Sequence, residues 1–241
     1  MKVGIVCIAK DEDNYVEEWV NYHHKLGVDE IVMYENNWSC PIDKPFLKKI
    51  KWDGKHQQMP AYNNFLENFR QEYDWILFLD VDEFLVLKKH SNIKDFLIEN
   101  DNDNGIAINW MWFGSCGRKE RGEHPNSLLK QFTLRNKDVD NHIKTILKSS
   151  SGGKMVLPHN PNIHLFDTNH KKVMGPFNQG GPTDQAQVNH YHYKTYEDWL
   201  IRCERGQSDH TPNRKPHQWD DCIGLSCDVE DLTALNFMYN S

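Results

Sequence analysis

Two aspartates follow a continuous apolar run and have the spacing of a metal-binding pair. Residues 75–79 are all apolar, and Asp80 and Asp82 come directly after them. Such a run indicates a strand buried on both faces, and open α/β sheets bind ligands beyond the carboxyl ends of their strands. In extended backbone, side chains two residues apart lie on the same side, so both carboxylates can hold one hard cation. Mg²⁺ or Mn²⁺ held there would neutralise charge on a departing diphosphate.

Two histidines near the C-terminus have the same spacing. His190 and His192 lie in residues 189–193, which we expect to form a short strand, so both rings face one side. Imidazole is a good ligand for Mn²⁺. The spacing alone does not select between the two rings.

Polar residues also follow two earlier predicted strands. Lys10 and Glu12 come after residues 3–9, and Glu35 and Asn36 come after residues 30–34. Carboxylates and amides can pair with a nucleotide base or with ribose hydroxyls, so we predict that these four residues bind a donor together with Asp80. The alternative is that they form polar turns.

The elements that position these residues alternate along the chain. Apolar residues recur at helical spacing over residues 15–26, which Gly27 ends, and over residues 61–69. The order strand–helix–strand–helix–strand predicts an α/β sheet with right-handed crossovers. Further strands are expected at residues 105–110, 131–134, 143–148 and 163–166. Two helices are expected to close the chain, one from Thr195 with Asp198 as its capping partner and one from near Asp228.

Composition excludes some classes of protein. The formal net charge is −7, whereas a nucleic-acid binder has a basic excess. No apolar run approaches the roughly 20 residues that span a bilayer, and no export signal is recognisable. The six cysteines form no C-x-x-C pair, so we expect free thiols. These features predict a location in the cytoplasm, either free or peripheral to a membrane.

Four segments, in register over nearly the whole chain, resemble known glycosyltransferases. Residues 5–12 with Glu18, Trp19, His23 and Gly27 resemble the opening of family 2-like enzymes, especially the branch related to family 92. Residues 79–84 resemble the metal motif of that branch, and residues 110–115 resemble its tryptophan–Phe-Gly-Ser segment. Residues 189–195, followed by Arg205 and Gly206, resemble its closing His-Tyr motif.

The resemblance implies a single-domain GT-A fold over residues 1–241, in which a mixed central sheet is flanked by helices. Its nucleotide-binding half would cover about residues 1–110 and its acceptor half about residues 111–241. It also implies a nucleotide-sugar donor, with a UDP-sugar favoured, a glycan or lipid-linked acceptor, and inversion of the anomeric centre. It selects His190 to join Asp80 and Asp82 as a metal ligand.

A carboxylate base is expected to deprotonate the acceptor hydroxyl. The candidate bases are Glu120, Glu123, Asp167 and Asp184, and the sequence does not rank them.

Two other functions fit part of the pattern. A phosphatase of the haloacid-dehalogenase type also has D-x-D after an apolar strand, but its Thr or Val two residues later is Phe84 here. A non-catalytic sugar-binding module would keep the aromatic residues without needing the two aspartates.

Overall fold

The strands build one large mixed sheet and two small ones. A computed structural model describes residues 1–101, 104–206, 212–222 and 224–240. The large sheet contains β1 (Val3–Ala9), β2 (Glu30–Glu35), β3 (Leu47–Lys51), β4 (Trp75–Phe78), β5 (Glu83–Leu87), β6 (Gly105–Trp112), β8 (Ile143–Lys148), β11 (Leu165–Phe166), β12 (Lys172–Val173) and β13 (Ala186–His190). The small sheets pair β9 (Met155–Leu157) with β10 (Asn160–Pro161) and β7 (Leu134–Arg135) with β14 (Val229–Glu230).

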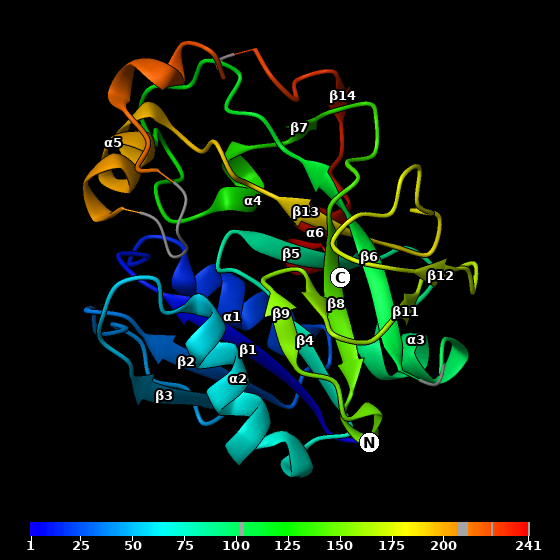
Figure 1. Cartoon of the computed structure of the whole chain (residues 1–241). Helices are drawn as coiled ribbons and strands as arrows, with labels where there is room; N and C mark the ends of the chain where they lie inside the picture. Colours follow the sequence, from blue (N-terminus) through cyan, green and yellow to red (C-terminus); the bar gives the residue numbers. More distant parts are fainter. Residues whose placement is uncertain (102–103, 207–211, 223, 241) are drawn as a thin grey trace.

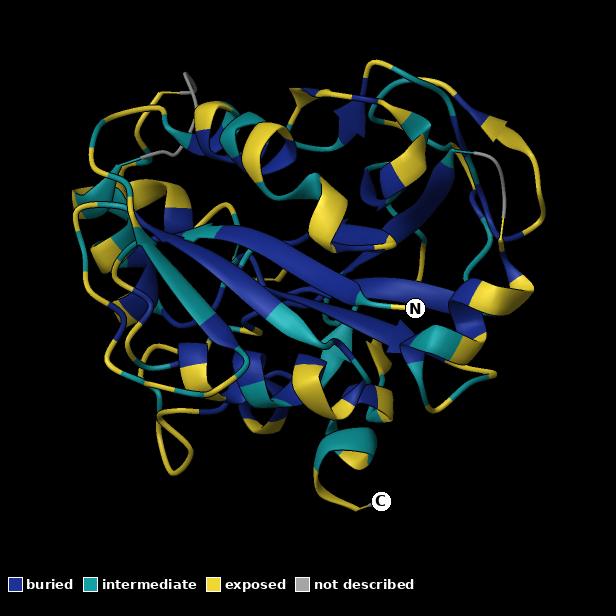
Figure 2. Cartoon of the chain, turned by 90° about the horizontal axis from the view of Figure 1, so that it is seen from below, coloured by how far each residue is buried: buried dark blue, intermediate teal, exposed yellow. Residues whose placement is uncertain are grey.

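Helices cover the sheet and the strands are buried between them. They are α1 (Val16–Lys25), α2 (Gln58–Asn68), α3 (Ile93–Glu99), α4 (Leu128–Gln131), α5 (Tyr196–Arg205) and α6 (Thr233–Tyr239), with short 3₁₀ helices at Arg70–Glu72, Ser149–Ser151 and Pro216–Trp219. Figure 2 shows the dark-blue strands as a layer with helices on both faces. The predicted mixed α/β sheet flanked by helices is confirmed.

The first strand shows how the sequence builds this layer. Val3, Ile5 and Cys7 of β1 pack in one cluster with α1, whereas Val6 packs in a second cluster with α2. Side chains of a strand point alternately to the two faces of the sheet. Alternate residues of β1 therefore pack into the cores on opposite faces. Helix α1 ends before Gly27, whose φ of +102° is a conformation that glycine adopts without steric strain.

Parallel pairing brings the ends of the early strands to one edge. β1 pairs in parallel with β2 and with β4, and β2 pairs in parallel with β3. The loops that follow β1, β2 and β4 therefore emerge together (Figure 1). This edge is where Lys10, Glu12, Asn36, Asp80 and Asp82 follow their strands.

One C-terminal strand returns to the middle of the sheet. β13 pairs antiparallel with β5 and parallel with β6, and Figure 1 shows it between them. His190 lies opposite Glu83 and Trp112 in this pairing. The end of the chain thus supplies side chains to the edge built by its beginning.

Several local predictions differ from the structure. Residues 128–131 form helix α4 where a strand was predicted from 131, and Leu134–Arg135 is only a two-residue strand. β13 ends at His190, so His192 lies outside it. The last helix begins at Thr233, because residues 229–230 pair with β7 before it. The capping pair of α5 is confirmed, since Thr195 and Asp198 exchange side-chain to backbone hydrogen bonds.

The prediction of free thiols is wrong for two cysteines. Cys116 and Cys227 form a disulfide between segments 111 residues apart in the sequence, while Cys7, Cys40, Cys203 and Cys222 are free. In the part of the chain described here, no helix has the length and apolar character of a membrane span. The expectation of one domain stays a prediction, which limited proteolysis tests.

Candidate active site

The two aspartates lie in a tight turn between β4 and β5. The backbone N–H of Glu83 donates to the carbonyl oxygen of Asp80 at 3.0 Å, so residues 80–83 turn where an extended segment was expected. The side chains of Asp80 and Asp82 consequently have different neighbours. Both nevertheless line the same cleft.

Asp80 is held by fixed donors on all sides. Its Oδ1 accepts hydrogen bonds from Gln58 at 2.9 Å and Tyr62 at 3.3 Å, and its Oδ2 pairs with the Lys144 ammonium at 2.8 Å. Lys144 is buried and also lies 2.9 Å from Glu83. Burial raises the pKa of Asp80, but the charge of Lys144 outweighs it and holds that pKa below its usual value. Burial raises the pKa of Glu83 well above its usual value.

Asp82 meets His190 at the end of β13. The Asp82 Oδ1 lies 3.7 Å from His190 Nε2, and its Oδ2 lies 3.9 Å from the Lys194 ammonium. A backbone hydrogen bond of 2.9 Å from Tyr191 to Asp82 fixes the two segments together. Burial raises the pKa of Asp82, but the nearby cations, Lys194 first, depress it strongly. Burial lowers the pKa of His190 to about 4, so its ring is neutral at physiological pH.

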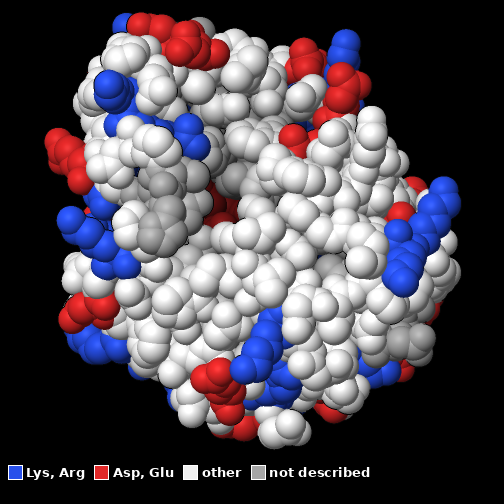
Figure 3. Space-filling view, in the orientation of Figure 1, with Lys and Arg blue, Asp and Glu red and all other residues white. Residues whose placement is uncertain are grey.

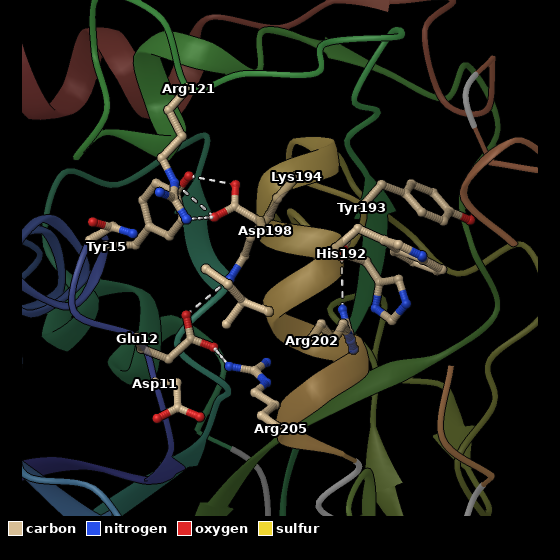
Figure 4. A pocket seen from close by; sticks show the side chains of 13 residues that line it. Asp11, Glu12, Tyr15, Arg121, His192, Tyr193, Lys194, Asp198, Arg202 and Arg205 are labelled. Atoms are coloured by element: carbon tan, nitrogen blue, oxygen red, sulfur yellow. Dashed lines mark hydrogen bonds and ion pairs between the residues drawn. The ribbon is translucent and has the colours of Figure 1, made fainter. Parts of the chain in front are cut away.

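A network of buried charges joins the loop after β1 to α5. Glu12 accepts from Lys194 at 3.0 Å and also pairs with Arg205, as Figure 4 shows. Lys10 and Arg205 each donate to the backbone carbonyl of the other, at 3.0 and 2.7 Å. Arg202 donates to the His192 carbonyl at 2.8 Å. Burial lowers the pKa of Arg202 to about 10, which leaves it charged at neutral pH.

These residues line a cleft of about 750 Å³. Its lining comes from the segments that follow β1, β2 and β4, from β6 and β13, from the segments before α2 and β8, and from α5. Figure 3 shows a hollow in this face of the molecule with acidic atoms at its depth. We call Glu12, Asp80, Asp82, Arg202 and Arg205 the charged cluster of the cleft.

Aromatic and imidazole rings form a second, neutral part of the lining. The Trp110 ring centroid is 4.3 Å from that of His190, 4.9 Å from that of His142 and 4.9 Å from that of His159. We call Trp110, Trp112, His142 and His159 the ring cluster. His190 contacts both clusters, since it faces Asp82 and packs on Trp110 and Trp112.

Residues 45–222 match the sequence model of Glycosyltransferase family 92. The chain belongs to glycosyltransferase family 92. Family 92 proteins of Ricinus communis and Oryza sativa subsp. japonica are each 22% identical to it, over 94% and 98% of this chain respectively. The chain spans 45% and 44% of their lengths. The crystal structure of S. aureus TarS 1-349 in complex with UDP aligns with a TM-score of 0.42 and 13% identity, over 92% of this chain and 70% of that one.

The structure brings together most of the predicted donor-binding residues of this family 92 chain. Lys10, Glu12, Asn36 and Asp80 line the cleft, and Asn36 donates to the carbonyls of Trp52 and Gly54 at 2.8 and 2.9 Å. Glu35 lies beside them without lining the cleft. Its carboxylate accepts the Cys40 backbone N–H at 2.8 Å, which is the turn-stabilising role left open as the alternative.

The candidate bases lie away from the cleft lining. Glu120 and Glu123 are exposed in the loop after β6. Asp184 is exposed and pairs with Lys89 at 3.1 Å. Asp167 is buried and accepts backbone hydrogen bonds from Asn169 and Lys171 in its own turn. The geometry therefore supports none of these four residues as the base.

Asp82 and His190 fit a divalent cation better than Asp80 does. The 3.7 Å separation between Asp82 Oδ1 and His190 Nε2 is too long for a hydrogen bond and leaves both atoms able to bind a ligand. A carboxylate beside a neutral imidazole is a ligand pair that suits Mn²⁺. Among the described residues, however, no group of three or more His, Cys, Asp or Glu side chains is arranged to hold a metal ion. The remaining ligands would have to come from a donor or from water.

The buried cations were not predicted from the sequence. Lys144 is 1% exposed on β8 and Lys194 is 8% exposed in the segment before α5. A lysine within an otherwise apolar strand such as residues 143–148 is the only available sign, because a buried ammonium needs a carboxylate partner.

Proposed function

We propose that this chain transfers a sugar from a nucleoside-diphosphate sugar to a hydroxyl group of a glycan or lipid-linked acceptor, with inversion of the anomeric carbon. The observation that carries the proposal is the meeting of Asp82 and His190 in a cleft at the carboxyl ends of β1 and β4. The buried Lys194 ammonium lies 3.9 Å from Asp82. Membership of family 92 supports the reaction class.

The charged cluster would bind the donor. Arg202 and Arg205 remain cationic and line the cleft, so they can attract the diphosphate. Asp80 is fixed by Gln58, Tyr62 and Lys144 and can accept hydrogen bonds from ribose hydroxyls without moving. Asn36 lies at the part of the cleft formed by the loop after β2, where the nucleoside would lie.

Mn²⁺ or Mg²⁺ would be held by Asp82 and His190, with Asp80 close by. When bound, the ion supplies positive charge that stabilises the departing diphosphate. Lys194 keeps Asp82 ionised and therefore ready to bind it.

The two alternatives to sugar transfer are a phosphatase and a non-catalytic binding module, and the first is the less well supported. Family 92 membership favours sugar transfer over a haloacid-dehalogenase phosphatase. In addition, both oxygens of Asp80 are engaged by Gln58, Tyr62 and Lys144, which is unfavourable for the nucleophile that such a phosphatase needs. The experiment below distinguishes sugar transfer from the remaining alternative, a non-catalytic sugar-binding module.

The test is a screen of UDP-, GDP- and dTDP-sugars by thermal shift, with and without Mn²⁺, followed by an assay for release of the nucleoside diphosphate. We expect at least one donor to raise Tm only with the metal and then to be consumed. Asp184→Asn is the matched control, because Asp184 is an exposed carboxylate outside the cleft. Binding of a sugar without turnover of any donor would identify a binding module instead.

Location in the cytoplasm is a separate proposal. The Cys116–Cys227 disulfide is unfavourable to it, because disulfides persist mainly in oxidising compartments. Mass spectrometry of alkylated thiols in protein from its native cells shows whether Cys116 and Cys227 are reduced, as a cytoplasmic location predicts, or joined.

A further inference from the structure

The proposed transfer needs a proton acceptor that the charged cluster does not offer. The acceptor oxygen attacks the anomeric carbon from the side opposite the departing diphosphate, and its proton must leave as the bond forms. In the cleft lining, Glu12 is paired with Lys194 and Arg205, and Asp80 is paired with Lys144. Both are committed to cations, and Asp82 is the proposed metal ligand beside Lys194. The inference that follows rests on the proposed function.

The other lining groups are also unsuited to this task. Burial lowers the pKa of His159 to about 3, so it is a weak base. Among the described residues, the buried Nδ1 atoms of His159 and His192 have no hydrogen-bond partner that would orient either ring. Glu204 lies on α5 beside Arg205, on the side proposed for the diphosphate. His56 lies in the loop that Asn36 contacts through Gly54, on the nucleoside side.

One imidazole in the ring cluster has a carboxylate partner. His142 Nδ1 lies 2.7 Å from Asp140 Oδ1, and the same oxygen accepts the backbone N–H of His142 at 2.8 Å. The side chains are 36% and 30% exposed, so the pair is open to a ligand. His142 lines the cleft that also contains Asp82 and His190.

The ring of His142 is also held by packing. It stacks on Trp110 with 4.9 Å between centroids and an interplanar angle of 24°, and it meets Phe177 edge-on at 4.7 Å. Trp110 also packs on His190 at 4.3 Å, so one indole contacts both His142 and the proposed metal ligand, and all three rings line one cleft. Three contacts therefore fix its plane.

The hydrogen bond determines which nitrogen is free. Burial raises the pKa of Asp140, but its hydrogen bonds with His142 outweigh this and lower it, so the carboxylate is ionised and can only accept. Nδ1 of neutral His142 must then carry the proton, and Nε2 keeps its lone pair. This is the protonation state that a general base needs.

We propose that His142 is the general base of the sugar transfer and that Asp140 is its positioning residue. The acceptor hydroxyl gives its proton to Nε2 as its oxygen forms the new bond to the anomeric carbon. The bond from that carbon to the diphosphate oxygen breaks, and its electron pair leaves with the nucleoside diphosphate. Asp140 stabilises the imidazolium, which later releases its proton to water.

The substrate class follows from the surroundings of His142. Trp112 is partly exposed and lines the cleft together with His142, and sugar rings stack their apolar faces on aromatic side chains. The acceptor group that reaches Nε2 is therefore a hydroxyl of a neutral sugar, which favours a glycan over the lipid part of a lipid-linked acceptor.

The test uses the full chain with Mn²⁺, the nucleotide sugar that the screen identifies, and a panel of p-nitrophenyl glycosides as acceptors. We expect His142→Ala to lower kcat for transfer about 10²–10⁴-fold while the affinity for the donor is unchanged. Added imidazole should restore part of the rate, because it can occupy the cavity left by the ring.

A second variant distinguishes loss of the base from a defect in folding. Asp140→Asn keeps the shape of the pair and should lower kcat by a smaller factor, with no change in acceptor KM and no rescue by imidazole. The matched control is His90→Ala, which removes a His–carboxylate pair of 2.6 Å with Glu99 outside the cleft. It should leave transfer unchanged.

Each outcome decides the proposal. Wild-type kcat in a folded His142→Ala variant, or a loss that imidazole does not repair and that follows donor affinity, overturns the role of His142. If the wild-type chain transfers no sugar from any donor, the proposed function fails and this inference fails with it.

Discussion

The charged cluster and the ring cluster of the cleft are held in place by different interactions. In the charged cluster, Asp80 and Glu12 are held by cations that are themselves buried, Lys144 and Lys194. In the ring cluster, Trp110, His142 and His159 pack against one another, and the pKa of His159 is lowered to about 3. One region fixes charge before any ligand arrives, whereas the other is held together by contacts between rings. The difference separates the handling of a charged leaving group from that of a neutral acceptor.

The largest effect is expected from Asp82→Asn. This change removes the carboxylate that faces His190 and should lower transfer about 10²–10³-fold, the usual cost of losing one electrostatic stabiliser in a site. Donor affinity in the presence of Mn²⁺ should fall, while Asp184→Asn leaves both unchanged. Wild-type Mn²⁺-dependent affinity in Asp82→Asn would show that the charged cluster does not bind the metal.

Removal of a buried cation should affect stability most. Lys144→Met leaves the buried Glu83 and the partly exposed Asp80 without their shared ammonium, and breaking a buried pair such as Lys144–Glu83 costs about 3–5 kcal/mol. For a domain of this size, Tm should fall by about 10 °C. Lys148→Met on the same strand is the control, since its pair with Asp101 is partly exposed. Equal Tm values for the two variants would contradict the view that the cluster is held by buried charge.

Lowering the pH tests whether the buried rings of His159 and His190 are neutral. The folded-state pKa values of His159 and His190 are about 3 and about 4, below the unfolded value near 6.5. Their contribution to stability is therefore complete above pH 6.5 and lost as pH falls from 6.5 towards 4. At pH 5 it should be smaller by about 2 kcal/mol for each ring. Urea titrations of the wild type and His159→Gln at pH 7 and 5 measure this, and equal pH dependence in both would exclude His159 as a source.

His190 joins the two clusters, and its removal should weaken binding more than stability. His190→Ala should lower the affinity for Mn²⁺ and donor about tenfold, or about 1.4 kcal/mol, and His192→Ala should do less. From the sequence alone, activity was expected to fall below the ordinary imidazole pKa near 6.5. Burial moves that expected loss to near pH 4. A variant that melts several degrees lower yet binds both ligands normally would make His190 a packing residue.

The smallest effect is expected at the edge of the ring cluster. Phe177 is 53% exposed and touches the edge of His142. Phe177→Ala should lower kcat about 2–10-fold, since one aromatic contact contributes about 0.5–1.5 kcal/mol, with donor affinity unchanged. Ile98→Ala, on α3 and 65% exposed, is the control. A change in donor affinity instead would mean that the two clusters do not act separately.

The sequence predicted the layers of the fold better than the details of the site. α1 and α2 are long enough to show a helical period, and β1, β2 and β4 are marked by apolar runs. α4 has four residues, too few for any period to appear, so residues 131–134 were assigned to a strand. β5 was missed because the acidic motif at residues 80–83 was interpreted as the end of an element.

The site residues divide in the same way. The positions of Asp80, Asp82 and His190 in the cleft could be predicted because these residues follow an apolar run or lie in a motif of the resemblance, while their roles stay predictions. Lys144, Arg202 and the His142–Asp140 pair could not, because their roles depend on partners brought close only by folding. The disulfide joins segments 111 residues apart, and spacing alone does not reveal such a pair.

The central position of β13 also has a consequence for how the protein is made. This strand pairs with β5, roughly a hundred residues earlier in the chain, and such long-range contacts form slowly. During synthesis, Asp82 leaves the ribosome long before His190, Lys194 and Arg205 exist. The cleft therefore becomes complete only after residues 186–205 have been made, and a chain truncated before β13 should fold its early strands without acquiring a working site.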